Sequence, residues 1–93
     1  MATKYIYAVI LNKLELVVDK NNAIQDIQTD MKHFGFYQEL AGAQKLFAEM
    51  KERYLGNAEV SYRDFTITET EEQLVIRDEL LNITLALKKY ELQ

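Results

Sequence analysis

Three side chains in the first half of the chain have the chemistry and the spacing of metal ligands. Asp26, Asp30 and His33 follow one another at intervals of four and three residues, which on a helix would place them on one face. Two carboxylates and an imidazole can bind a divalent metal and leave positions open for water. The sequence offers no second histidine to complete the site. We therefore interpret the three residues as the polar face of an amphipathic helix, and a metal-dependent enzyme built on them is the weakest of three functional hypotheses.

Other catalytic groups are scarce. His33 and Ser61 are the only residues of their types, and no pattern links them as base and nucleophile or places Ser61 in a Gly-x-Ser-x-Gly elbow. The chain has no cysteine, which excludes a disulfide framework, a thiolate zinc site and a cysteine nucleophile. Its three glycines are widely separated and form no phosphate-binding loop. We expect a protein that is not an enzyme and binds no metal or cofactor.

Acidic side chains gather in the last third of the sequence. The chain carries 11 basic and 15 acidic residues and has a net charge of −4. Residues 59–79 contain seven acidic residues and two arginines, so this segment has a charge of −5. Such a segment repels phosphate backbones, so direct nucleic-acid binding is not expected. It suits docking on a basic protein surface. With Tyr62, a residue type enriched at interfaces, the predicted protein-binding residues are Glu59, Asp64, Glu69, Glu71, Glu72, Asp78 and Glu79.

Length and composition indicate one small globular domain over residues 1–93. Hydrophobic residues make up 48% and charged residues 28% of the chain, a balance that argues against disorder. No apolar run has the length of a membrane span, and the start of the chain lacks the features of a signal peptide. We expect a cytoplasmic protein that binds no membrane.

The N-terminal stretch predicts a β-hairpin. Residues 5–11 are rich in β-branched and aromatic side chains, as is typical of strands, and residues 14–18 are apolar except for Glu15. A two-residue turn at Asn12-Lys13 would pair the two runs.

Two helices are predicted next, from their apolar spacing of three and four residues. The first begins after Asn22 and ends at Gly35, and the second extends from residue 36 or 37 to Leu55, where Gly56 provides a C-terminal stop. Residues 60–68 then favour a strand. Val60 and Tyr62 share one parity and Phe65 and Ile67 the other, as both faces being partly buried or a bulge near residues 63–64 would explain.

The last third of the chain fits two alternatives. In one, a helix begins near Thr70 and continues to Tyr90. In the other, residues 65–67 and 74–76 form paired strands across an acidic turn, and a shorter helix begins after Asp78. Both end in a helix over residues 80–90, whereas residues 71–77 stay open. The predicted fold class is α+β: an N-terminal antiparallel hairpin with at least one later strand in a small sheet, two central amphipathic helices and a C-terminal helix.

Some apolar residues fall outside the predicted helical stripes and suggest self-association. They are Leu46, Leu81 and Leu85, and a domain this small would gain stability from a homodimer. The leading functional hypothesis is a small acidic protein-binding module that docks on a larger protein, such as an inhibitor, an immunity protein or a phage-type accessory protein. A self-associating structural or regulatory module is the alternative.

Overall fold

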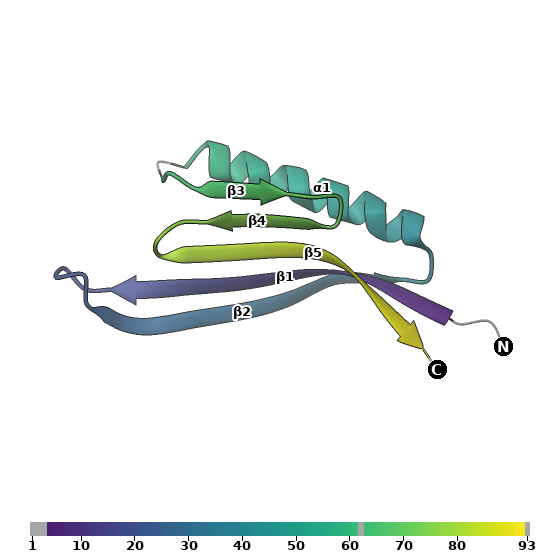
Figure 1. Cartoon of the computed structure of the whole chain (residues 1–93), viewed down its shortest axis with the longest axis horizontal. Helices are drawn as coiled ribbons and strands as arrows, with labels where there is room; N and C mark the ends of the chain where they lie inside the picture. Colours follow the sequence, from purple (N-terminus) through teal and green to yellow (C-terminus); the bar gives the residue numbers. More distant parts are fainter. Residues whose placement is uncertain (1–3, 62, 93) are drawn as a thin grey trace.

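The protein is an antiparallel β-sheet with one helix on one of its faces (Figure 1). The structure, a computed structural model, describes residues 4–61 and 63–92. The sheet has five strands in the order β2-β1-β5-β4-β3, and all neighbours pair antiparallel. The elements are β1 (Lys4–Val18), β2 (Ile24–Tyr37), α1 (Leu40–Glu59), β3 (Thr66–Glu69), β4 (Gln73–Arg77) and β5 (Leu81–Leu92).

Strand β1 runs straight through the position where the sequence predicted a turn. Asn12 and Lys13 lie in mid-strand, paired with β2 on one side and β5 on the other. The prediction was wrong because this pair lacks the glycine that a two-residue hairpin turn favours. The chain turns later, where Asn22 adopts a left-handed φ of 64°. There Asp19 Oδ1 accepts hydrogen bonds from the backbone N–H groups of Asn21 (2.8 Å) and Ala23 (3.0 Å), which closes the loop.

The first predicted helix is also wrong, because residues 24–37 form strand β2. Two β-bulges explain the misleading spacing. Gln25 and Phe34 are the extra residues where the pairing of β1 with β2 shifts register. A bulge resets the side-chain alternation of a strand, so Ile24 and Ile27 lie on the same face although three residues separate them. A three-and-four spacing that resembles a helix thus arises in an extended chain.

Helix α1 is confirmed in the region predicted for the second helix, although it begins at Leu40 and continues past Gly56 to Glu59. Its buried residues are Ala43, Phe47 and Met50, at the helical spacing of four and three. No other α-helix lies in the part of the chain that the structure describes. Within those residues, no helix is both long and apolar enough to cross a membrane.

The C-terminal helix is the third correction, since residues 81–92 form strand β5. This strand lies between β1 and β4, and its middle is buried on both faces, with Leu85 fully buried and Ala86 4% exposed. The strand does alternate, with Leu81, Ile83, Leu85 and Leu87 on the helix side and Asn82, Thr84 and Lys88 on the other. The spacing of Ile83, Leu87 and Tyr90 imitated a helix and concealed this alternation. Upstream, the paired-strand alternative is the one the protein adopts, with Ile67 opposite Ile76 in β3 and β4.

The hydrophobic core lies between α1 and one face of the sheet. It consists of Val9, Leu11, Phe47, Met50, Leu74, Ile76 and Leu85. The molecule measures 59 × 26 × 17 Å, and the end of the β1–β2 hairpin projects beyond the helix (Figure 1). Among the described residues, no helix or further sheet packs on the second face, although Ala8, Ile10 and Ala86 at its centre are at most 5% exposed.

Candidate functional site

The three metal-ligand candidates do not converge. Asp26 and Asp30 lie on the face of β2 that points to the helix side, whereas His33, opposite Ile10, points to the other face. The geometric basis for the metal site was a helix, and in a strand residues three apart face opposite ways. Instead, the His33 ring stacks on Phe36, with 5.3 Å between the ring centroids. No cluster of three potential metal ligands occurs among the described residues.

The acidic residues divide between the two ends of β4. Glu71 and Glu72 lie in the β3–β4 turn, with Glu69 at the end of β3. Asp78 and Glu79 lie in the β4–β5 turn, near Asp64 and the strand start at Thr66, since Thr66 pairs with Arg77. Glu59 ends α1, and Tyr62 falls outside the described residues. The segment is thus acidic at two separate places and forms no single patch.

Ion pairs neutralise part of this charge. Lys51 of α1 lies 2.8 Å from Glu69, and Arg63 pairs with Asp78 at 2.5 Å. Each pair connects elements that are distant in sequence: the first joins the helix to β3, and the second joins the α1–β3 connection to the β4–β5 turn. Two of the predicted protein-binding residues therefore contribute to the fold.

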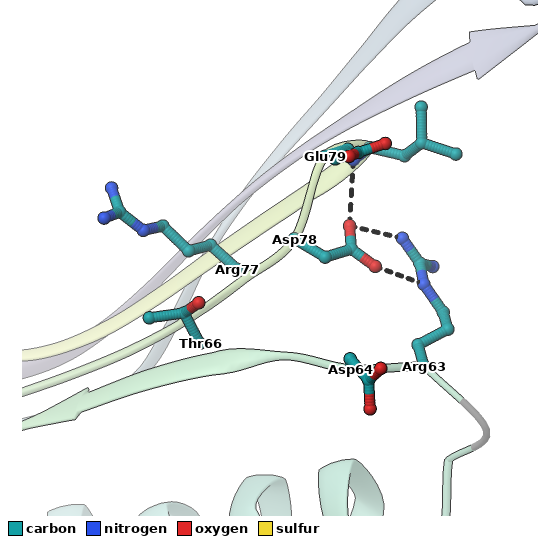
Figure 2. Close-up of a pocket in the computed structure, with 7 residues that line it drawn as sticks. Arg63, Asp64, Thr66, Arg77, Asp78 and Glu79 are labelled. Atoms are coloured by element: carbon teal, nitrogen blue, oxygen red, sulfur yellow. Dashed lines mark hydrogen bonds and ion pairs between the residues drawn. The ribbon is translucent and has the colours of Figure 1, made fainter.

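The Arg63–Asp78 pair is the most elaborate polar arrangement of the protein (Figure 2). Arg63 donates from Nε to Asp78 Oδ2 at 2.5 Å and from Nη2 to Oδ1 at 2.6 Å. The same Oδ1 accepts hydrogen bonds from the backbone N–H groups of Leu80 and Leu81, each at 2.8 Å. The Arg63 guanidinium, and then these N–H groups, hold the pKa of Asp78 below its usual range against the opposing effect of burial.

A surface pocket of about 640 Å³ surrounds this pair. Its lining includes Asp64, Thr66 and Arg77, and Arg77 points away from the pair (Figure 2). Because the central carboxylate already has four hydrogen-bond donors, the pocket offers a ligand little unpaired charge. We interpret the arrangement as a latch that fixes the β4–β5 turn.

The leucines predicted to mediate self-association lie in or against the core. Leu85 is fully buried and Leu81 is 9% exposed, while Leu46 packs against the core from α1. Leu81 and Leu85 were assigned to a helix with two apolar sides, whereas in β5 they lie on the same side of the strand, facing the helix.

The side of the sheet opposite α1, which we call the open face, carries several exposed apolar side chains. It consists of the strand residues that alternate with the helix-facing ones, such as Ala8, Ile10 and Asn12 of β1 and their partners on β2 and β5. Among the described residues of this face, the charged ones are Lys4, Arg77 and Lys88, and none is Asp or Glu. The face thus has a formal charge of +3 in a chain with a net charge of −4.

Large apolar side chains on the β1–β2 part of the open face are exposed to solvent. We call this the apolar strip: Leu14 (42% exposed), Ile27 (57%), Met31 (59%) and Phe36 (62%). Ile27, Met31 and Phe36 follow one another along the open face of β2. Leu14 of β1 lies opposite Thr29, between Ile27 and Met31. The sequence contained the signal, but the helix prediction assigned Ile27 and Met31 to a buried stripe.

Comparison with known proteins supplies no family. No protein-family model matches the chain, and no curated protein or solved structure was found to match it.

Proposed function

We propose that the protein is a small protein-binding module that docks on another protein through the open face. One observation carries this proposal: the helix covers one face of the sheet and leaves the apolar strip of the other face exposed. An antiparallel sheet exposed to water on one side normally carries polar residues there. Contiguous exposed apolar side chains that are flanked by polar ones are typical of interaction sites.

The charge of the open face restricts the chemistry of the partner. A basic surface placed directly over Lys4, Arg77 and Lys88 would be repelled. We therefore expect the partner to place an apolar patch against the apolar strip and to border that patch with neutral or acidic groups. Basic residues of the partner, which the acidic composition favours, would instead meet the β3–β4 turn at Glu71 and Glu72. This arrangement has the apolar centre and polar rim of protein–protein interfaces.

A protein partner fits this surface better than a nucleic acid. Single-stranded nucleic acids bind to faces that combine positive charge with exposed aromatic rings. Among its described residues the open face exposes the rings of His33, Phe36 and Tyr90, but most of its apolar strip is aliphatic. The rest of the molecule is acidic enough to outweigh the three cations, because the chain as a whole has a net charge of −4.

A chain without cysteine also suits a reducing compartment such as the cytoplasm.

Site-specific photo-cross-linking in the cells that express the protein tests the proposal. A photoreactive phenylalanine analogue replaces Phe36 on the open face, and in a matched control it replaces Gln44 on the exposed surface of α1. We expect a cross-linked protein from position 36 alone, and we expect Met31→Lys in the same chain to remove it while the circular dichroism spectrum stays unchanged. Equal products from both positions, or a product that Met31→Lys leaves intact, would contradict the proposal.

Nucleic-acid binding is tested separately with a fluorescent single-stranded oligonucleotide at low salt. We expect no change in anisotropy. Binding that weakens steeply with salt and is lost in Lys88→Glu would replace the protein partner with a nucleic acid.

A further inference from the structure

The two edges of the sheet differ in how they are protected. Strand β3 forms one edge and has four residues, which is a common way to protect an edge. Strand β2 forms the other and has 14 residues. Between its two bulges, the segment from Asp26 to His33 pairs regularly with β1, and every residue in it is exposed. Its outward backbone N–H and C=O groups form a template for a further strand.

We propose that a second copy of this chain occupies that edge, with the two β2 strands paired antiparallel across a two-fold axis that passes through Thr29. The two sheets then form one continuous sheet. Ile27 and Met31 belong both to this edge and to the apolar strip. The charged residues that test the dimer, Asp26 and Lys32, lie on the helix side of β2, so its outcome is distinguishable from that of the function proposed for the open face.

Backbone geometry limits the possible registers. Alternate residues of an edge strand direct their N–H and C=O groups outward, so an outward residue must meet an outward residue of the other copy. In a symmetric antiparallel pair this requires a two-fold axis that passes through a residue and not between two residues. The same condition keeps the open faces of both copies on the same side of the joint sheet.

The side chains then select Thr29 as the centre. With the axis there, Asp26 of one copy lies opposite Lys32 of the other, and this pair occurs twice because of the symmetry. Ile27, 57% exposed, lies opposite Met31, 59% exposed, which also occurs twice. Opposite charges and apolar pairs directly across strands both stabilise a sheet. The paired stretch covers almost the whole regular segment between the bulges.

Neighbouring registers are less favourable. An axis through Asp30 places two identical carboxylates opposite each other, and an axis through Gln28 places Asp26 opposite Asp30, so both bring like charges together. An axis through Met31 pairs Asp30 with Lys32 but meets the Phe34 bulge after two residues on each side of the centre. The register centred on Thr29 is therefore the one that combines charge complementarity with length.

Charge reversal with rescue tests both the dimer and its register, and the readout is the solution mass from light scattering across a concentration series. We expect the wild type to approach twice the chain mass of 10.9 kDa as concentration rises. Asp26→Lys and Lys32→Asp each create two like-charge pairs, so each should raise the dissociation constant about tenfold. The D26K/K32D double variant restores both pairs and the wild-type constant, and an equimolar mixture of the two single variants forms a heterodimer.

Two further variants distinguish the register from a general charge effect. Asp30→Lys changes the net charge as Asp26→Lys does and removes the ion pair of Asp30 with Lys32 of its own strand (3.8 Å), but it faces Gln28 of the other copy, so it should weaken the dimer far less than Asp26→Lys. Thr29→Cys introduces the only thiol of the chain, opposite its own copy, and should give a cross-linked dimer on oxidation, whereas Gln44→Cys on α1 should not. A wild type that stays at the chain mass at all concentrations would overturn the dimer. Loss of the dimer in Asp30→Lys without loss in Asp26→Lys would overturn the register.

Discussion

The latch between Arg63 and Asp78 gives the most informative test of the stability of this fold. Asp78→Ala removes four hydrogen bonds at once: two from the guanidinium and two from the backbone of the β4–β5 turn. Asp78→Asn is the matched change, because its amide oxygen can still accept the two turn hydrogen bonds while the charge is lost. The pair of variants thus separates the turn from the ion pair.

The magnitude follows from the exposure of the two side chains. The Asp78 side chain is 16% exposed and that of Arg63 is 39% exposed, so the pair lies between a surface ion pair, worth about 0.2–1 kcal/mol, and a charge-assisted hydrogen bond, worth about 1.5–3 kcal/mol. We expect Asp78→Asn to lower the free energy of unfolding by about 1 kcal/mol and Asp78→Ala by about 2–3 kcal/mol. In a domain of this size, 1 kcal/mol corresponds to a change in Tm of about 4–8 °C.

The pH dependence has a definite sign. The pKa of Asp78 is lower in the folded protein than in the unfolded chain, first because of Arg63. The stabilisation is therefore complete above the unfolded pKa, about 3.9, and is lost as the pH falls through the lower folded value. Urea unfolding of the wild type and of Asp78→Asn should show the full difference at pH 7 and almost none once the pH is well below 3.9.

Arg63→Ala provides the control, because in that background Asp78→Asn should lose most of its effect at pH 7. A difference between wild type and Asp78→Asn that stays the same at both pH values would refute the assignment of the latch to the ionised carboxylate. Full additivity of the two substitutions would refute the pairing itself.

Two other predictions concern the helix and the core. Gly56→Ala should raise the free energy of unfolding by about 0.5–1 kcal/mol, since a Cβ there meets no atom within 4 Å; Gly42→Ala should fall short of this gain because its Cβ would lie 2.8 Å from Tyr37 Cδ1, and thermal unfolding of both variants checks the difference. Leu74→Ala should cost about 2–5 kcal/mol because Leu74 is 1% exposed, as measured by urea unfolding; a cost below 1 kcal/mol would contradict its place in the core.

Part of this fold can be predicted from the sequence because some signals are local. Helix α1 shows its spacing in Ala43, Phe47 and Met50, and the start of β1 shows its β-branched and aromatic character. In both cases the pattern follows from the conformation of the segment itself. The absence of cysteine likewise limits the available chemistry whatever the fold.

Strands β2 and β5 could not be identified in this way, because partners decide their conformation. The alternation of β5 becomes decisive only when β1 and β4 pair with its two edges, because Ile83, Leu87 and Tyr90 also fit a helical spacing. The bulge at Gln25 gives β2 a helix-like spacing. A bulge forms in response to a neighbouring strand, so its position is a tertiary property. The division of the acidic residues between two turns depends on the same pairing.

Met31 and Met50 show that the sequence by itself does not determine which apolar side chains become buried. Both methionines stand in apolar runs with spacings of three and four residues, and the runs predict burial equally. In the structure Met50 is 7% exposed and Met31 is 59% exposed. Met50 lies on the side of the single helix that packs against the sheet, whereas Met31 lies on β2, on the face of the sheet that the helix does not cover. Apolar character is encoded locally, but whether it stabilises the core or forms an exposed surface depends on which other elements pack over it.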